Sequence, residues 1–558
     1  MQIEPSDLVL ERAYTWEKQR PDEVYMTQPL GGSAVRTYSW AQTVDEARRM
    51  AAYLQSFGFP PGSKIALLSK NVAHFVMADL AIWMAGYVSV AIYPTLQAQT
   101  IRYILDHSES KLIFIGKLDG WDAMKPGVPD ALPRVSFPSS PPNDYPSWDS
   151  LVKITPPIAG EPRRSLDETA MLVYTSGSTG QPKGVEQTFR SIAAVAKGAS
   201  IALSVTRRDR FISYLPLAHV FERGCIESVS LYVGCAMFFA DSLDTFVADM
   251  KRARPTLFHS VPRLWLKFQQ GVLAKLPSEK LDRVLAIPLL NRLVKYVLLR
   301  GLGLDAARIA ISGSAPIPPS LIAWYQGLGL ELLEGYGMTE NLAYSHVSMP
   351  GKSRLGYVGN TMPGVQQRIS PEGEVLVKSP ADMKGYYKQP ELMRGLYTDD
   401  GFLKTGDRGE IDSEGRLKLT GRVKELFKTS KGKYVAPAPI ENLLGADQNV
   451  ESCCVSGSGE PQPFAFVVLA ESLRKKLKNG GDGRAGLETA LKRLLHDVNT
   501  KLEEYEQLGF LVVVQDEWQV ENGFLTPTMK IKRNVVESTY AGQVPGWYAR
   551  KQEVIWQG

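Results

Sequence analysis

Apolar residues in the first part of the chain alternate between helical spacing and short continuous runs. Thr43 and Glu46 form a capping box, and apolar residues at helical spacing follow it up to Gly58. The apolar run at residues 64–68 comes after a Pro-Pro-Gly turn and predicts a buried strand. The pattern then predicts, in order, a helix capped by Asn71 and ending near Gly86, a strand at 87–93, a helix at 100–107 and a strand at 111–116.

This strand–helix–strand rhythm predicts a largely parallel α/β sheet, with ligands at the carboxyl ends of its strands. Residues 125–162 are poor in periodicity and rich in Pro and Ser, so we predict a surface connection there. From Gly373 onward the pattern changes to short strands, at residues 374–378, 409–412 and 416–420. These strands predict a small β-subdomain.

A domain boundary is predicted close to Gly421, where a lysine-rich stretch begins. The residues beyond it show a smaller α+β pattern, with helices at 438–444 and 486–504. We therefore predict an N-terminal domain at 1–421 and a C-terminal domain at 422–558. At 558 residues the chain is long enough for at least two domains.

Composition excludes several classes of function. The net charge of +5 comes from 64 basic and 59 acidic residues, which is too mild for a nucleic-acid-binding footprint. The four cysteines lack metal-site spacing and predict free thiols in a reducing cytoplasm. The start of the chain lacks signal-peptide character, and the apolar run at 80–93 is shorter than the roughly 18–20 residues that span a bilayer. We predict a cytoplasmic protein, monomer or homodimer, with no transmembrane segment and with room only for peripheral membrane contact.

The strongest chemical signal is a loop rich in glycine and hydroxyl residues that follows a short apolar strand at 170–173. It reads Tyr-Thr-Ser-Gly-Ser-Thr-Gly-Gln-Pro-Lys-Gly over residues 174–184. Its glycines leave backbone N–H groups free to approach an anion, and Lys183 adds a positive charge. The loop is no Walker A motif, because Pro182 stands where that motif needs its second glycine. The sequence therefore predicts a phosphate site of another kind, with a Gly/Ser-rich surface turn as the alternative.

Three weaker motifs follow, each with a structural alternative. Tyr336 stands between two glycines and offers a flat face to a purine, while Glu340 is a hard oxygen ligand suited to Mg²⁺; the alternative is a strand-end turn. The carboxylate of Asp407 can accept both hydroxyls of a ribose, and Arg422 can donate to the same sugar, or the two form a pair that holds a β-turn. Lys530 follows Pro527 in a basic run that alternatively is only a solvated face.

In this order and at these separations, the four motifs resemble the adenylate-forming superfamily of acyl-CoA synthetases, adenylation domains and luciferases. The resemblance extends over residues 8–533. Two further stretches, residues 215–223 taken with 260–263 and residues 525–528, resemble the long-chain fatty acyl-CoA synthetase branch.

The resemblance implies a role for each matching residue. The β- and γ-phosphates of ATP would be held by Thr175, Ser176, Gly177, Ser178, Thr179, Gly180 and Lys183. The adenine would be flanked by Gly313, Ser314, Ala315, Tyr336 and Gly337, and the ribose would be bound by Asp407 and Arg422. Thr339 would lie near the α-phosphate, Glu340 would bind Mg²⁺, and Lys530 would bridge the substrate carboxylate and the α-phosphate. His219 would lie beside the acyl group unless it is a satisfied core histidine, and Lys424 would be the hinge of a mobile C-terminal domain.

The function implied is an ATP-dependent acid–thiol ligase. It would activate a medium- or long-chain fatty acid as acyl-AMP with Mg²⁺ and transfer the acyl group to coenzyme A. The alternatives are an adenylating enzyme for a short, branched or aryl acid, or one that loads a carrier-protein thiol. A catalytically silent nucleotide-binding scaffold is a further alternative.

Overall fold

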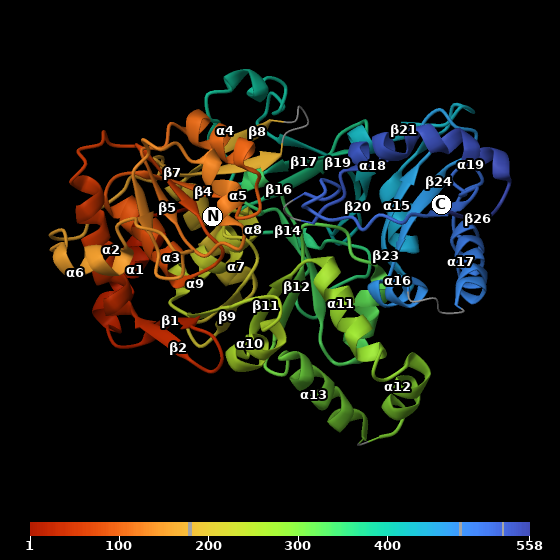
Figure 1. Cartoon of the computed structure of the whole chain (residues 1–558), viewed down its shortest axis with the longest axis horizontal. Helices are drawn as coiled ribbons and strands as arrows, with labels where there is room; N and C mark the ends of the chain where they lie inside the picture. Colours follow the sequence, from red (N-terminus) through yellow and green to blue (C-terminus); the bar gives the residue numbers. More distant parts are fainter. Residues whose placement is uncertain (177–180, 289, 479–482, 527–528, 558) are drawn as a thin grey trace.

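The computed structural model describes residues 1–176, 181–288, 290–478, 483–526 and 529–557. Figure 1 shows a large body formed by the first three quarters of the chain, with a smaller C-terminal part beside it. The predicted mixed α/β architecture is confirmed: sheets of mainly parallel strands are covered by helices in the large body.

The predicted parallel sheet forms the first layer of the large body. Its spatial order is β18 (Gly385–Tyr386), β8 (Pro182–Thr188), β7 (Thr169–Ser176), β4 (Val88–Ile92), β3 (Lys64–Leu68), β5 (Leu112–Ile115) and β6 (Arg134–Ser136). Neighbouring strands from β7 to β6 run parallel, and β8 turns back antiparallel beside β7. The predicted phosphate loop is therefore the connection between β7 and β8.

Helices surround these strands and those of the sheets described below. In the large body they are α1 (Val9–Gln19), α2 (Trp40–Gln55), α3 (Ala73–Met84), α4 (Ala98–Ser108), α5 (Trp121–Met124), α6 (Trp148–Ile154), α7 (Phe189–Ala202), α8 (Val220–Glu222), α9 (Ser228–Val233), α10 (Phe246–Ala253), α11 (Pro262–Leu273), α12 (Ser278–Leu285), α13 (Leu290–Leu302) and α14 (Pro319–Gly327). Helix α3 has no solvent-facing stripe, because every one of its residues is buried. It therefore lies between layers, as its apolar sequence requires.

Two of the helix caps that the sequence predicts differ in the structure, one because of a tertiary contact and one because of a local cap one turn earlier. Asn71 does not cap α3; its side-chain amide instead donates to Ser213 Oγ at 2.9 Å and to the Leu215 carbonyl. Instead, the backbone N–H of Ala73 at the start of α3 donates to Oε1 of Gln28, a residue of another sheet, at 3.0 Å. The capping box of α2 lies one turn before the predicted one, because Ser39 and Gln42 bond reciprocally. Thr43 is inside the helix.

The predicted surface connection at residues 125–162 is only partly correct. It contains strand β6, which extends the first sheet, and helix α6, whose first residue Trp148 is fully buried. The Trp148 indole donates to Glu46 Oε2 on α2 at 2.8 Å. A short strand and a single buried aromatic anchor leave too little periodicity to be seen among prolines and serines.

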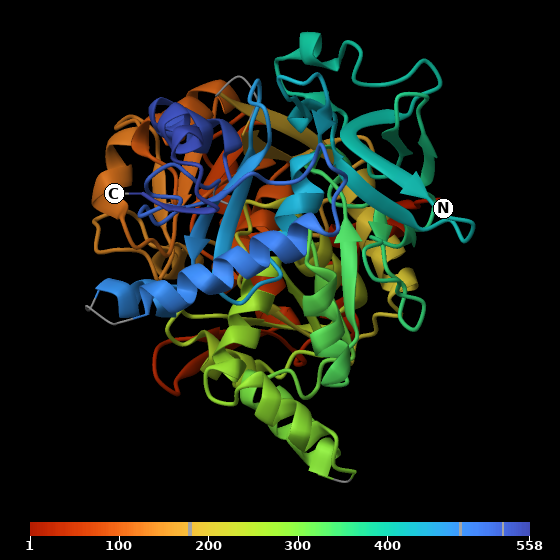
Figure 2. The same cartoon turned by 90° about the vertical axis from the view of Figure 1, so that its right-hand side faces the viewer.

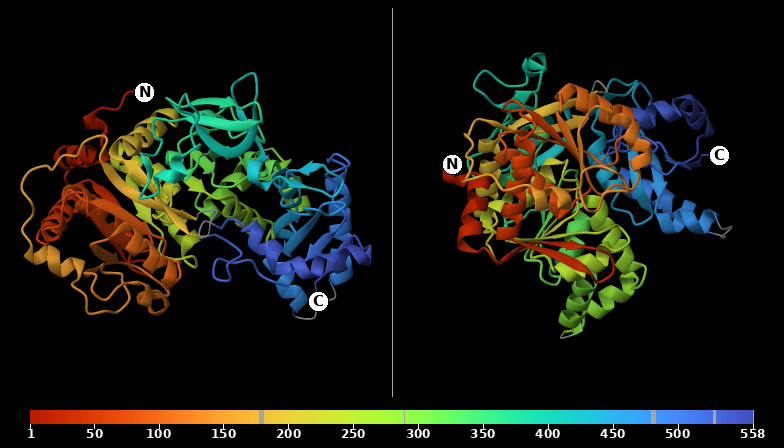
Figure 3. Two further views of the ribbon diagram at one scale, coloured as in Figure 1. Left: turned by 90° about the horizontal axis from the view of Figure 1, so that it is seen from above. Right: turned by 60° about the vertical axis from the view of Figure 1, so that its left-hand side comes forward.

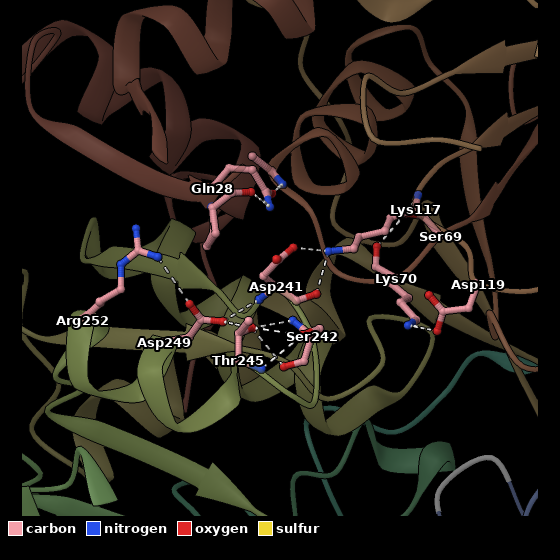
Figure 4. Close-up of polar contacts among 12 residues, drawn as sticks. Gln28, Ser69, Lys70, Lys117, Asp119, Asp241, Ser242, Thr245, Asp249 and Arg252 are labelled. Carbon is pink, nitrogen blue, oxygen red and sulfur yellow. Dashed lines mark hydrogen bonds and ion pairs between the residues drawn. The ribbon is translucent and has the colours of Figure 1, made fainter. Parts of the chain in front are cut away.

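Two further sheets complete the α/β part of the large body. One has the order β2 (Val35–Ser39), β1 (Val24–Pro29), β10 (Ala236–Phe239) and β9 (Arg210–Ser213). The other has the order β11 (Leu257–Ser260), β12 (Ile309–Ser312), β13 (Leu332–Tyr336), β14 (His346–Val347) and β15 (Asn360–Thr361). Figure 4 shows polar contacts where the first sheet meets β10: Lys117, after β5, donates to the Asp241 carbonyl at 2.6 Å.

A buried ion network anchors the segment that carries His219. Arg223 begins the π-helical turn η3 (Arg223–Glu227) and is almost fully buried. Its guanidinium pairs with Asp79 of α3 and Glu227, and it donates to Ser89 Oγ of β4 at 2.9 Å. Burial raises the pKa of the Glu227 carboxyl well above its usual value, and Asp79 adds to that rise. The network joins η3 to the first sheet. Because its charged groups are buried, they are desolvated and depend on one another for compensation.

The β-subdomain has the order β16 (Gln366–Ile369), β17 (Glu374–Lys378), β19 (Leu403–Ile411) and β20 (Leu417–Arg422). In the C-terminal part, β23 (Val450–Ser456), β24 (Phe464–Leu469), β25 (Leu511–Val513) and β26 (Val554–Trp556) form a sheet, after the short pair β21 (Phe427–Lys428) and β22 (Tyr434–Val435). Its helices are α15 (Pro437–Leu444), α16 (Glu471–Lys478), α17 (Arg484–Asn499), α18 (Arg533–Tyr540) and α19 (Val544–Arg550). Helix α17 ends five residues before its predicted end.

The C-terminal part has its own hydrophobic clusters, which begin at Phe427, and it lies at one end of the molecule (Figure 3). An ion pair joins it to the large body, because Arg263 of α11 donates to Glu451 Oε1 at 2.6 Å. The division of the chain at residues 421 and 422 remains our proposal.

Helices α12 and α13 project from the large body as a hairpin (Figure 2). Large apolar side chains are exposed at its tip and along α13: Ile287, Leu290, Leu293, Tyr296 and Val297. None of the helices in the described ranges combines the length and the hydropathy of a membrane span.

We expect Arg223→Leu to destabilise the protein by about 3–5 kcal/mol, because it leaves Asp79 and Glu227 buried without a cation. Urea unfolding followed by tryptophan fluorescence would measure the effect. The control Arg102→Leu breaks an exposed pair with Asp106 and should change the unfolding midpoint little. Equal midpoints for the two variants would show that the buried network does not stabilise the fold.

Candidate active site

A pocket of about 100 Å³, partly open to solvent, lies along strands β11, β12 and β13. Its walls come from α7, the segment from His219 to Val229, strands β11 to β14, the turn after β13, and Lys530 of the C-terminal part. One end is polar, with Ser314, Tyr336, Thr339 and Lys530. The other end is apolar, and its lining includes Val195, Ala199, Leu203, Val205, Phe211 and Leu257.

Small residues allow close packing at the polar end. Gly313 and Gly335 line the pocket at the carboxyl ends of β12 and β13, and a Cβ on Gly313 would lie 3.3 Å from the Phe221 ring. A Cβ on Gly337 would lie 2.4 Å from the backbone of Ala343, so that only glycine fits there. Ser314 adopts a positive φ of 70°, a strained conformation for a residue with a side chain. Gly313 and Gly337 are thus required by close packing within the protein, beside the strained backbone of Ser314.

Asp407 joins residues that are distant in sequence. Tyr336 Oη donates to its Oδ2 at 2.6 Å, and Arg422 Nε donates to its Oδ1 at 2.8 Å. Strands β19 and β20 place Asp407 and Arg422 opposite each other. Burial raises the pKa of the Tyr336 phenol well above its usual value, and Asp407 adds to that rise, so the phenol remains a proton donor. The carboxylate retains lone pairs that can accept further hydroxyl groups.

Lys530 reaches the pocket from the C-terminal part. Its neighbour Ile531 forms an antiparallel bridge with Leu525, and the backbone N–H of Thr526 donates to the Lys530 carbonyl at 2.8 Å. Desolvation at the pocket lowers the pKa of the Lys530 ammonium, and Arg422 lowers it further. Asp407, Glu340 and Glu425 oppose that shift. The side chain therefore brings a positive charge close to Asp407, Glu340 and Glu425.

Glu340 lies on the turn η4 (Thr339–Asn341), and its Oε1 accepts a hydrogen bond from Tyr386 Oη at 2.7 Å. The Lys183 ammonium lies over the same tyrosine ring, 5.3 Å from its centroid. The side-chain amide of Gln187 donates to the Thr339 carbonyl at 2.9 Å and so holds the turn in place. The predicted phosphate-side and metal-side residues are therefore neighbours around Tyr386.

The predicted phosphate loop is described only at its base. Thr175 pairs with Lys183 and Ser176 with Pro182 at the end of the β7–β8 hairpin. Gly177, Ser178, Thr179 and Gly180 lie outside the described residues.

His219 lines the pocket and caps the next helical turn, because its Nδ1 accepts from the backbone N–H of Phe221 at 3.2 Å. Burial lowers the pKa of the His219 imidazole to about 3, and the charge of Lys530 contributes, so the ring is neutral at physiological pH. Lys424 is exposed on the turn η6 (Val423–Glu425), directly after Arg422.

The structure thus brings most of the predicted residues to one place. His219, Gly313, Ser314, Tyr336, Gly337, Thr339 and Lys530 line the pocket, and Asp407, Arg422 and Glu340 adjoin it through the contacts above. Ala315 is exposed and does not line the pocket, and Lys424 lies outside it.

Sequence reasoning missed Gln187, Tyr386 and His259, which contact the site or line the pocket. Each stands alone in its segment without a motif. Only the pairing of β18 with β8 brings Tyr386 beside Lys183 and Glu340, so no local signal could have found it.

Comparison with known proteins identifies two matching families. Residues 13–387 match the family described as "AMP-binding enzyme", and residues 425–552 match "AMP-binding enzyme C-terminal domain". Long-chain-fatty-acid–CoA ligase FadD15 of Mycobacterium bovis is 27% identical over 591 residues, with 98% of each chain covered. Long chain acyl-CoA synthetase 6, peroxisomal, of Arabidopsis thaliana is 29% identical over 578 residues, covering 92% of this chain and 81% of that one.

Solved structures share the fold over nearly the whole length. The A domain of carboxylic acid reductase from Segniliparus rugosus, solved with AMP and a co-purified carboxylic acid, superposes with a TM-score of 0.80 at 22% identity. That match covers 98% of this chain and 94% of the other. Anthranilate CoA ligase AuaEII, solved with anthranoyl-AMP, gives 0.79 at 21% identity, with 97% and 100% covered.

We expect Asp407→Asn to weaken AMP binding by about 10-fold or more, because the amide cannot replace a charge-assisted acceptor for Arg422 and a nucleotide hydroxyl. Isothermal titration calorimetry with AMP would measure the change. The control Asp412→Asn removes a carboxylate that pairs with Arg416 in the turn between β19 and β20, and it should leave binding unchanged. Similar AMP affinities for the Asp407 variant and the wild type would rule out this contact.

Proposed function

Because the chain belongs to the AMP-binding enzyme family, we propose that it is an acid–thiol ligase that forms acyl-AMP from ATP and a fatty acid and then an acyl-CoA. The observation that carries the proposal is the pocket itself. Its polar end, at Tyr336, Thr339 and Lys530, continues into an apolar end that suits an aliphatic chain. ATP, coenzyme A and the carboxylic acid are the substrates.

Activation is needed because a carboxylate is a poor electrophile. In the first step a carboxylate oxygen attacks the α-phosphorus of ATP, and the bond to the β-phosphate bridging oxygen breaks, so that pyrophosphate leaves. In the second step the deprotonated thiol attacks the acyl carbon, and AMP leaves with the electron pair of the broken C–O bond. The protein needs no nucleophile of its own, and its task is to align two anions and to screen their repulsion.

Each group at the polar end has a proposed part in this alignment. We assign Lys530 to the carboxylate and the α-phosphate, because it supplies a cation at the polar end of the pocket. Asp407 and Arg422 bind the ribose, while Tyr336 and the backbone at residues 313–315 flank the adenine. Thr339 lies by the α-phosphate, and residues 175–180 with Lys183 take the β- and γ-phosphates.

Mg²⁺ fits the donor set near the phosphates. Glu340 has a carboxylate oxygen, Oε2, for which the described residues provide no hydrogen-bond partner. The described part of the chain has no cluster of three or more metal-binding side chains, which agrees with an ion held by one carboxylate and by substrate phosphates. When bound, Mg²⁺ supplies positive charge that offsets the charge of the phosphates. We propose that Glu340 holds it.

The second half-reaction requires the thiol to reach the acyl carbon. We propose that the C-terminal part rotates about Lys424 and thereby withdraws Lys530 from the pocket. The support is that Lys424 is exposed and lies between the strand that bears Arg422 and the clusters of the C-terminal part.

Alternative substrates and acceptors are distinguishable. The depth of apolar lining favours an aliphatic acid over a small aryl acid, and a carrier-loading enzyme would ignore free coenzyme A. The presence of Lys530, Glu340 and Asp407 around one pocket argues against a silent scaffold. A cytoplasmic location and a monomeric or homodimeric state remain predictions.

Lys530→Ala should lower the rate of acyl-AMP formation by about 100-fold or more, because the developing charge between two anions loses its cation. It should spare thioester formation from supplied acyl-AMP. Pyrophosphate exchange with hexadecanoic acid measures the first half-reaction, and acyl-CoA release from synthetic acyl-AMP measures the second. The neighbouring surface lysine variant Lys532→Ala is the matched control. Equal loss of both half-reactions would contradict the assigned role.

For peripheral membrane contact we propose the α12–α13 hairpin, with an anionic bilayer surface as its partner. Leu290, Leu293 and Val297 form an exposed apolar stripe on α13 at positions i, i+3 and i+7. Residues 275–300 contain six Lys or Arg residues and two acidic ones. Among the described residues no acidic group pairs with Arg292 or Lys295. Each basic residue near an anionic surface contributes about 1 kcal/mol.

The double variant Leu293→Glu with Val297→Glu should reduce binding to vesicles of phosphatidylglycerol and phosphatidylcholine by about 10-fold or more. Vesicle flotation measures it. The control Leu243→Glu changes an isolated side chain that is 93% exposed elsewhere, and it should bind like the wild type. Failure of the wild type to bind anionic vesicles would refute this surface, as would loss of a dimer in the double variant without loss of vesicle binding.

A further inference from the structure

A histidine in the pocket wall has ring nitrogens without a hydrogen-bond partner among the described residues. His259 lies on β11, lines the pocket and is only 4% exposed. Its Nδ1 is buried and unpartnered, and no described group bonds to Nε2. A buried polar group without a hydrogen-bond partner costs about 1–3 kcal/mol of stability. Such a group is therefore expected in a native pocket where a ligand or a water molecule forms the missing hydrogen bond.

The other pocket histidines have local hydrogen bonds. His346 bonds through Nδ1 to Ser345 Oγ at 2.8 Å and through Nε2 to Gln367 Oε1 at 2.7 Å. The Nδ1 of His219 accepts from the backbone of Phe221, and this residue lies at the reaction end. His259 therefore differs from its neighbours in leaving both nitrogens for a partner from outside the described chain.

The position of the imidazole is fixed by its surroundings. Its ring lies 5.8 Å from that of Phe211 and 5.7 Å, edge to face, from that of Phe221. The backbone is held as well, because Tyr214 Oη donates to the His259 carbonyl at 3.0 Å. A ring held on both sides can offer a hydrogen bond in one direction at little entropic cost.

The pairing of β11 with β12 shows how far the His259 side chain lies from the polar end of the pocket. His259 pairs with Ile311 across β11 and β12, and Gly313 lies two residues farther along the same face of β12. Two residues of a strand span about 7 Å, so His259 lies about that distance below the reaction end. Leu257, on the same face of β11, lies deeper still. The imidazole therefore faces an inner part of the acyl chain rather than the carboxylate.

The charge state and the surroundings of the His259 imidazole favour a neutral oxygen atom of the ligand as its hydrogen-bond partner. Burial lowers the pKa of the His259 imidazole to about 4, so that at physiological pH it offers one N–H donor and one acceptor. The residues around it are aromatic or aliphatic, and the charged group among the described lining residues, Lys530, lies at the polar end. A charged substituent would be desolvated there without compensation, whereas a hydroxyl or a keto oxygen would satisfy the ring.

We propose that His259 determines specificity for fatty acids that carry an oxygen substituent, a hydroxyl or keto group, within the chain. The imidazole would bond this oxygen while Leu257, Ile311 and Val195 contact the surrounding methylenes. This inference rests on the proposed ligase function and names the substrate class of the same pocket. His259 is a positioning residue here, because it does not touch the reacting atoms.

The test compares hexadecanoic acid with a series of hydroxyhexadecanoic acids that differ in the position of the hydroxyl group. Pyrophosphate release by the full-length enzyme with ATP, Mg²⁺ and coenzyme A gives kcat/KM for each acid. We expect the wild type to prefer one internal isomer over hexadecanoic acid. We expect His259→Leu to lower kcat/KM for that isomer by about 10- to 100-fold, while it leaves hexadecanoic acid unchanged or improved. The loss should appear mainly in KM, and His259→Gln should restore part of it.

The matched control is Ile311→Val, which reshapes the same level of the pocket without removing a polar group and should affect both acids alike. The comparison of acids in the wild type needs no variant, so misfolding of His259→Leu cannot hide the result. No preference for any isomer in the wild type overturns the inference and leaves the ligase function intact, as does an equal loss for both acids in the variant. Absence of pyrophosphate release with every acid would instead overturn the proposed function and this inference with it.

Discussion

Two anions must meet in the proposed chemistry, and the cation that we assign to the carboxylate and the α-phosphate is not part of the large body. It is the ammonium group of Lys530, which the C-terminal part extends into the pocket beside Asp407, Glu340 and Arg422. Lys530 is the one charged side chain among the described residues that line the pocket. Because it belongs to a separate part of the chain, its presence in the pocket depends on how that part lies.

The part of the pocket wall that follows His219 depends on a buried ion network. Arg223 compensates the buried carboxylates of Asp79 and Glu227 and bonds to Ser89, so it joins the segment after His219 to α3 and β4. A hydrophobic replacement of the whole network would cost little stability, but removal of one member leaves an uncompensated charge in the interior. The network therefore constrains which arrangement of η3 is allowed, and η3 forms one side of the pocket.

The two ends of the pocket have different physical characters for different tasks. At the polar end, glycines allow the backbone to pack closely, and Asp407 orders Tyr336 and Arg422. The apolar end excludes water and offers dispersion contacts along its length. Within it His259 is a polar group fixed between Phe211 and Phe221, so the same wall that favours methylenes also has one place that favours an oxygen.

Local pattern alone determined much of this protein. Strand β3 has its predicted bounds, and β4 and β5 differ from their predicted bounds by one residue at each end. The order of the four motifs indicated the family. Both predictions were possible because the strand–helix alternation and the loops that approach phosphate are encoded in neighbouring residues. Where the prediction was wrong, distant groups had competed with local ones: Gln28 caps α3 in place of Asn71, and Trp148 anchors a segment that appeared to be only surface. The pocket was beyond local reasoning for the same reason. Its depth, the meeting of Tyr386 with Glu340 and the unpartnered ring of His259 arise from strand pairing and packing between segments far apart in the chain, and only the tertiary structure decides those.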